Sequence, residues 1–81
     1  MKALVHVTLK QDVLDPQGKA IAHACGSLGL GSVEGVRQGK LFELELDAPD
    51  EAGARTLLDE LCQKLLANPV IEDYEIVSLG G

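Results

Sequence analysis

The sequence has 81 residues, and because domains usually run to about 100–150 residues, we expect residues 1–81 to form a single domain. Its 46% apolar content argues against disorder. The net charge of −6 disfavours binding to nucleic acid or to an anionic membrane surface, since both require basic partners. No stretch has the length of a membrane span or the apolar core of a signal peptide, so we expect a cytoplasmic protein with reduced thiols.

The first part of the chain predicts a strand followed by a helix. In residues 3–10 every second side chain is apolar, so that one face is uniformly apolar, which is typical of a strand. Asp15 and Pro16 predict the start of a helix, because Asp caps free amides and Pro fits the first helical position. This helix carries one apolar stripe, spaced i, i+3, i+4 and i+7: Ile21, Ala24, Cys25 and Leu28. The glycines of residues 26–32 (GSLGLGS) follow the helix, whereas a phosphate-binding loop precedes one, so we interpret them as turn and cap residues.

The second part predicts two strands, a helix and a last strand. Residues 33–38 and 41–46 are β-like runs separated by Gly39 and Lys40, which predicts a hairpin. In the second run three side chains point one way, Phe42, Leu44 and Leu46, and two point the other way, Glu43 and Glu45. A second helix starts at residues 47–50, with acidic residues and Pro49 in its first turn, and ends at Asn68 and Pro69. Residues 70–79 form the last strand. The buried stripe of this second helix is expected to comprise Ala54, Leu57, Leu58, Leu61 and Leu65, flanked by Cys62 and Leu66.

The order β-α-β-β-α-β predicts an α+β fold of the ferredoxin-like type. It is a two-layer sandwich, a four-stranded antiparallel sheet with both helices on one face. One sheet face then has no helices, and a chain of this size is near the lower limit of core size, so we expect a homo-oligomer.

No set of residues in the sequence predicts catalysis by this chain alone. His6 and His23 have no catalytic partner at a suggestive spacing, and surface or half-buried histidines are more frequent than active ones. Cys25 and Cys62 fall on or beside apolar stripes, where a free Cys behaves as a small apolar side chain. We therefore expect no catalytic residue, no metal site and no cofactor site in this chain.

Three ordered segments carry a resemblance to a known family: residues 13–18 (VLDPQG), 36–40 (VRQGK) and above all 62–74 (CQKLLANPVIEDY). With them the chain resembles PurS, the small subunit of phosphoribosylformylglycinamidine (FGAM) synthase (EC 6.3.5.3). The resemblance implies a part in de novo purine biosynthesis, in which formylglycinamide ribonucleotide (FGAR), glutamine and ATP give FGAM. It further implies a non-catalytic bridge between a glutaminase (PurQ-like) and a synthetase (PurL-like) subunit that supports ammonia transfer. ATP and Mg²⁺ would belong to the synthetase subunit, and the chain itself would be a homodimer or homotetramer.

We predict that the partner-binding residues are Arg37, Lys40, Asn68, Asp73 and Tyr74. Tyr74 is the best anchor, because aromatic side chains are enriched at interface hot spots. The alternatives are that Arg37 and Lys40 belong to a solvated turn and that Tyr74 packs on the helices.

Two other functions share this topology. A small-molecule regulatory module of the ACT type binds amino acids between paired domains, but such domains are normally fused to an enzyme, and we expect this chain to stand alone. An RNA-binding domain of the RRM type needs aromatic side chains on its central strands and a positive field, and this acidic chain offers only Phe42 on those strands.

Overall fold

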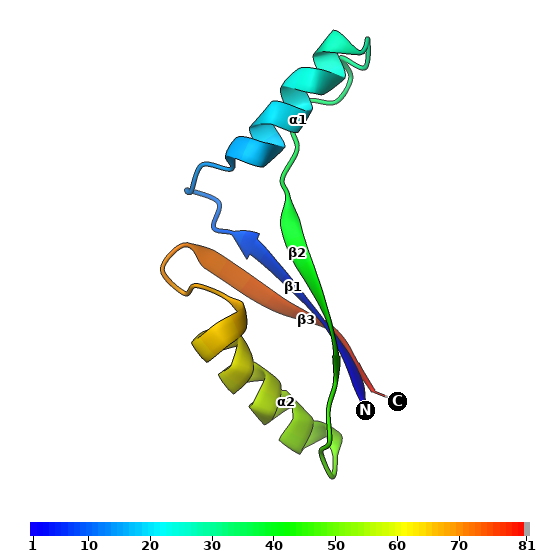
Figure 1. Cartoon of the computed structure of the whole chain (residues 1–81), viewed down its shortest axis with the longest axis vertical. Helices are drawn as coiled ribbons and strands as arrows, with labels where there is room; N and C mark the ends of the chain where they lie inside the picture. The colour runs from blue at the N-terminus through cyan, green and yellow to red at the C-terminus, as the bar shows by residue number, and fades with distance from the viewer. Residues whose placement is uncertain (81) are drawn as a thin grey trace.

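Three antiparallel strands form the sheet in the order β2-β1-β3 in the computed structural model, which describes residues 1–80 (Figure 1). The elements follow the chain in this order: β1 (Lys2–Leu9), α1 (Pro16–Ser27), β2 (Gly39–Glu45), α2 (Glu51–Leu61), a π-helical turn η1 (Cys62–Leu66) and β3 (Glu72–Gly80). The α+β class and the antiparallel sheet are confirmed. No described helix has both the length and the apolar character that a membrane crossing needs.

The inner face of the sheet is built on the central strand β1. Ala3, Val5 and Val7 are at most 2% exposed, as the alternation in this strand predicts. Phe42 lies opposite Val5 on β2, and Ile76 lies opposite it on β3, so the three strands present one continuous apolar face. The predicted alternation of β2 is confirmed, because Phe42 and its inward neighbours pack against the core while the intervening glutamates face away.

The helix α2 covers this inner face. Asp50 caps its first turn by accepting a 2.7 Å hydrogen bond from the amide of Gly53. Ala54, Leu58 and Cys62 are completely buried at spacing i, i+4, i+8. This is the line along which α2 lies on the sheet, and the small side chains at its two ends allow a close approach.

Two members of the expected α2 stripe are not buried. Leu57 is 43% exposed and Leu65 is 73% exposed, so their predicted burial is wrong. The reason is geometrical: the contact follows the line through Leu58, and the π-helical turn that begins at Cys62 changes the direction of the last side chains. Leu66, expected only beside the stripe, packs against the core.

The helix α1 does not lie on the sheet but projects from its end as an arm (Figure 1). The predicted start is confirmed, because Asp15 is the N-cap and Pro16 the first helical residue. Beyond the helix, Gly29 adopts a positive φ of 79° and the amide of Leu30 donates to the carbonyl of Cys25, which confirms Gly29 as a turn residue after the helix. Gly26, by contrast, lies within α1. With the arm, the molecule measures 51 × 27 × 13 Å.

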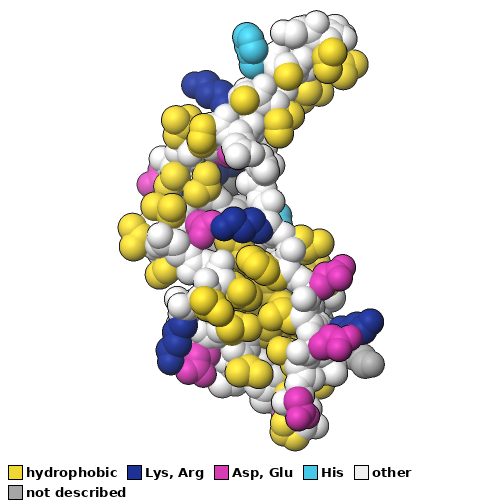
Figure 2. Space-filling view, in the orientation of Figure 1, with side chains coloured by type: hydrophobic (Ala, Val, Ile, Leu, Met, Phe, Trp, Pro, Cys, Tyr) yellow, Lys and Arg dark blue, Asp and Glu magenta, His cyan; other side chains and the backbone are white. Residues whose placement is uncertain are grey.

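The expected placement of both helices on one sheet face is therefore wrong. Ile21 is 45% exposed and Leu28 is 75% exposed, although both belong to the apolar stripe of α1. Figure 2 shows the resulting row of apolar side chains along the upper end of the molecule. An apolar stripe predicts that a helix face is buried, but it does not specify which surface buries it.

The fourth strand is also absent from the described residues. Residues 33–38 form no strand, and Gly39 and Lys40 are not a hairpin turn but the first residues of β2, opposite Thr8 and Val7. The backbone amide of Gln38, which a sheet ladder would use, instead donates a 2.7 Å hydrogen bond to the carboxylate of Asp15. The segment that the sequence predicts as a strand is thus held by a side chain from the start of α1.

Candidate partner-binding surface

The predicted partner-binding residues gather around one end of the sheet. In an antiparallel sheet the end of β1 lies beside the beginnings of β2 and β3, and here the amide of Lys10 donates to the carbonyl of Ile71 across that end. Lys40 lies at the beginning of β2, and Asp73 and Tyr74 lie at the beginning of β3. We call this region the β3 end of the sheet, comprising Lys10, Lys40, Asn68, Glu72, Asp73 and Tyr74.

Two ion pairs connect the strands at the β3 end. The ammonium of Lys10 lies 2.7 Å from a carboxylate oxygen of Asp73, and that of Lys40 lies 3.6 Å from Glu72. The side chains of Lys40 and Asp73 are 63% and 62% exposed. An exposed pair such as Lys10–Asp73 contributes only about 0–1 kcal/mol to folding. The charged groups of Lys40 and Asp73 therefore remain available to a partner.

Tyr74 lies on the inner face, opposite Val7, and its ring packs against the core. Its hydroxyl donates to the carboxylate of Asp59 at 3.3 Å and accepts from the side-chain amide of Gln63 at 3.3 Å. Both partners belong to the α2–η1 segment. The alternative interpretation, in which Tyr74 packs on a helix, therefore describes its position in the isolated chain. The hydrogen bond from Gln63 is exposed, and the one to Asp59 is half-buried.

Asn68 organises the turn that leads into β3. Its side-chain oxygen accepts from the amide of Val70, its own amide donates to the carboxylate of Glu72, and its carbonyl accepts from the amides of Ile71 and Glu72. The turn leaves Val70 79% exposed and Ile71 39% exposed. Asn68 thus acts on the local surface through the turn that it holds, and this turn presents two branched apolar side chains to solvent.

A shallow hollow of about 300 Å³ lies at the β3 end, between the η1 turn and the beginning of β3. Its lining comprises Lys10, Cys62, Gln63, Ala67, Pro69, Glu72, Asp73 and Tyr74. Burial, and secondarily the charge of Asp59, raises the pKa of the Cys62 thiol, so this sulfur is not poised as a nucleophile. Sequence reasoning missed Lys10 and Gln63 because only the cross-strand register and the packing of α2 bring them to this place.

Arg37 lies beside the β3 end rather than in it. One guanidinium nitrogen donates 2.9 Å hydrogen bonds to the carbonyls of both Leu9 and Lys10. Its donor groups are therefore directed to the chain's own backbone, at the point where β1 ends.

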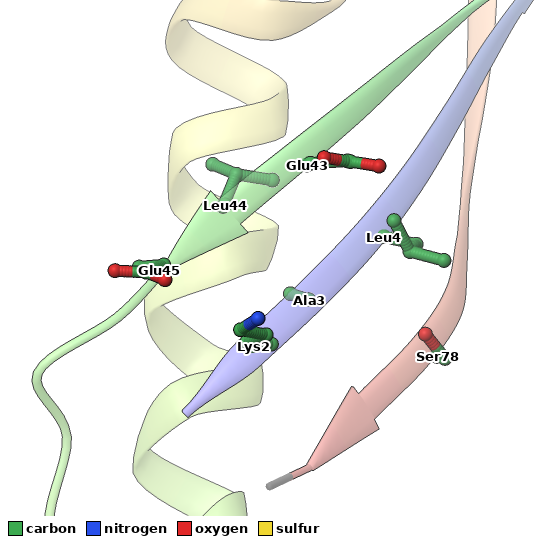
Figure 3. A pocket seen from close by; sticks show the side chains of 7 residues that line it. All are labelled: Lys2, Ala3, Leu4, Glu43, Leu44, Glu45 and Ser78. Carbon is green, nitrogen blue, oxygen red and sulfur yellow. The ribbon is translucent and has the colours of Figure 1, made fainter.

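The outer face of the sheet carries a second hollow, of about 410 Å³. Figure 3 shows its side chains on the strands with α2 behind the sheet, and the polar ones are Lys2, Glu43, Glu45 and Ser78. These groups supply one ammonium, two carboxylates and a hydroxyl, with no base beside the hydroxyl. Within residues 1–80, no three His, Cys, Asp or Glu side chains lie together as metal ligands would.

Comparison with known proteins relates this chain to one family. The family model described as PurS, phosphoribosylformylglycinamidine (FGAM) synthase, matches residues 2–79. The FGAM synthase subunit PurS of Synechocystis is 51% identical over 79 residues, covering 95% of this chain and 79% of the relative. The corresponding subunit of Bacillus subtilis is 49% identical over 73 residues, covering 90% and 86%.

Solved structures give the same relation. PurS of Methanocaldococcus jannaschii, described as one of the subunits of formylglycinamide ribonucleotide amidotransferase in the purine biosynthetic pathway, has a TM-score of 0.85 and 41% identity, covering 93% of this chain and 90% of that one. A chain of PurLQS from Thermotoga maritima has a TM-score of 0.85 and 30% identity, covering 98% and 99%.

Proposed function

The chain belongs to the PurS family of FGAM synthase subunits, and from that membership we propose that it is the adaptor that joins a PurL-like synthetase to a PurQ-like glutaminase. In this assembly FGAR, glutamine and ATP give FGAM. The observation that carries the proposal is the similarity, over nearly the whole chain, to one chain of the solved structure of PurLQS from Thermotoga maritima.

The chemistry of the reaction gives such an adaptor a purpose. The glutaminase releases ammonia, and the synthetase consumes it at a second site. Ammonia that escapes into water at pH 7 is mostly protonated and no longer nucleophilic, so the two sites must communicate without solvent. A subunit that holds the two proteins in contact raises the yield of transfer without performing a chemical step.

The side chains of this chain support a non-catalytic role. The two hollows contain ion pairs, carboxylates and a hydroxyl, with no nucleophile paired to a base. The only completely buried thiol, among the residues that the structure describes, has a raised pKa. From the family membership we propose that ATP and Mg²⁺ belong to the synthetase subunit.

We place the contact with the large subunits at the β3 end. Its exposed groups of opposite charge, Lys40 and Asp73, provide specificity, and the exposed turn at Val70 and Ile71 provides apolar area. Tyr74 lines the same hollow as Asp73, and its hydroxyl binds the side chains of Asp59 and Gln63.

We also propose that the chain is a homodimer or homotetramer. The apolar stripe of α1 is exposed along the arm, while the covered face of the sheet carries only α2. We assign a second copy as the surface that covers the arm, because each copy supplies one exposed apolar helix face and one sheet on which a single helix packs. Sedimentation that shows only monomer across micromolar concentrations would contradict this part of the proposal.

A binding experiment tests the contact surface. Tyr74→Ala and Lys40→Glu are each expected to weaken capture of both large subunits at least tenfold, the cost of about 1.4 kcal/mol of interface free energy. Lys64→Glu is the matched control, because Lys64 carries the same charge on the outer side of η1 and its side chain is 74% exposed. Equal capture by all three variants would remove the surface assignment. Failure of the unmodified chain to capture either subunit would overturn the adaptor function.

A further inference from the structure

The junction between α1 and the sheet is made of polar contacts rather than of core packing. The helix α1 has no extensive contact with the sheet or with α2. Its direction must therefore be determined at its base, where the chain leaves β1, enters α1 and later returns to β2.

Asp15 connects two of these segments through its two carboxylate oxygens. One oxygen accepts from the amide of Gly18 in the first turn of α1 at 2.9 Å, and the other accepts from the amide of Gln38, the residue before β2, at 2.7 Å. Asp15 is only 7% exposed, and it is the one charged residue in the buried set of the described chain. A carboxylate that accepts two amide hydrogen bonds in such a site is strongly held.

Gly18 shows how closely the helix approaches the returning chain. A Cβ atom at this position would overlap with the carbonyl oxygen of Val36. The first turn of α1 thus lies directly against the segment that leads to β2, and only glycine permits this approach.

Arg37 attaches the same segment to the sheet. Its guanidinium donates to the carbonyls of Leu9 and Lys10, which end β1. Arg37 therefore binds the end of β1, and its neighbour Gln38 binds Asp15 at the start of α1. The end of β1, the start of α1 and the segment before β2 are thus joined at one point.

We infer that Asp15, Gly18, Arg37 and Gln38 form a clasp that fixes the direction of α1 relative to the sheet. The second helix provides the comparison within the same chain. Asp50 caps α2 through Gly53 in the same way as Asp15 caps α1, but it is exposed and reaches no other element. The helix α2 is oriented by its packing on the sheet, and α1 is oriented by the clasp.

The importance of the clasp for assembly rests on the proposed function. An arm of fixed direction loses little conformational entropy when it docks, so a second copy binds it more tightly than it would a swinging arm. Asp15 and Arg37 are positioning residues in this scheme, since neither side chain forms the apolar surface that docks.

The direction of the arm is measured by the distance between two spin labels in the full chain. Ser27→Cys places a label at the tip of α1, and Ser78→Cys places one on β3, both at exposed positions. Cys25→Ser removes the half-buried native thiol, and Cys62 stays unlabelled because it is buried. An excess of unlabelled chain restricts the signal to distances within one copy.

The variants separate the clasp from helix capping. Asp15→Asn keeps an oxygen for Gly18 but presents N–H groups to Gln38, and Asp50→Asn makes the same change where there is no second partner. We expect a narrow distance distribution for the unmodified chain and for Asp50→Asn, and a broad one for Asp15→Asn. Exchange of the Gln38 amide should accelerate on the order of tenfold or more in Asp15→Asn alone, as loss of a charge-assisted hydrogen bond implies.

A second variant, Arg37→Gln, acts at an exposed side chain outside the core, so it tests the clasp even if Asp15→Asn folds poorly. It too should broaden the distribution. Narrow distributions in both clasp variants would overturn the inference. A chain with the expected distributions that does not join the large subunits would instead overturn the proposed function, so the two failures are distinguishable.

Discussion

Replacement of Leu58 by Ala is expected to destabilise the chain severely. Leu58 lies on α2 against the central strand, and it is 0% exposed. The substitution removes three carbon atoms at about 0.8 kcal/mol each, or about 2.4 kcal/mol, and the cavity that remains adds up to roughly 2 kcal/mol. The total of about 2.4–4.4 kcal/mol is a large part of the roughly 4–12 kcal/mol available to a chain of this length.

The adjacent residue is the matched control. Leu57 is 43% exposed, so Leu57→Ala is expected to cost at most about 1 kcal/mol. Both variants are unfolded in urea at one fixed protein concentration, because self-association makes apparent stability depend on concentration. With a slope of about 1 kcal/mol per molar urea, the midpoints of the two variants should differ by roughly 1.4–4.4 M. Equal midpoints would refute the placement of Leu58 at the centre of the core.

Three further outcomes follow from individual side chains. Gly18→Ala should lower the melting temperature, because the methyl group of the new alanine has no space beside Val36. Gly26→Ala should raise the free energy of unfolding by about 0.5–1 kcal/mol, since nothing lies within 4 Å of the added carbon. Equal effects of the two substitutions on the melting temperature would contradict the close approach of Gly18 to Val36. Hydrogen bonds from two backbone amides lower the pKa of Asp15 below its ordinary 3.8; the amide of Gln38 has the larger effect and that of Gly18 the smaller. The resulting stabilisation is present above that value and is lost as the pH falls through the lowered pKa, so urea midpoints at pH 5 and pH 3 should differ more in the unmodified chain than in Asp15→Asn. A thiol reagent should modify Cys25 in the folded chain and Cys62 only in denaturant, because Cys62 is buried and its pKa is raised; two rapidly reacting thiols would be inconsistent with this burial.

The local features of the sequence predict local structure well. The caps at Asp15 and the alternation of β2 are both present, because each depends on residues that are neighbours along the chain. The PurS resemblance, carried by three short segments, is confirmed over residues 2–79.

The errors concern contacts between distant segments. The predicted strand at residues 33–38 fails because its last amide binds Asp15, which is 23 positions away along the chain. The apolar stripe of α1 is present, but within residues 1–80 neither the sheet nor α2 covers it. Periodicity shows that a face is apolar, and it contains no information on whether the covering surface belongs to the same copy.

The residues of the β3 end were only partly predictable. The positions of Asp73 and Tyr74 follow from the beginning of β3, whereas the pairing of Lys10 with Asp73 requires the register of β1 and β3. Arg37 was predicted to face a partner, and in the structure its donors bind the end of β1. A side chain with five donors has many possible acceptors, and sequence alone does not select among them.

The most direct test of the adaptor function is the rate of FGAM formation from glutamine by purified PurL-like and PurQ-like subunits, with and without this chain. We predict that FGAM forms from glutamine only when all three proteins are present, that ammonium salt relieves much of the requirement for this chain, and that the chain alone turns over nothing. Turnover by the isolated chain, or an unchanged glutamine-dependent rate in its absence, would contradict the account.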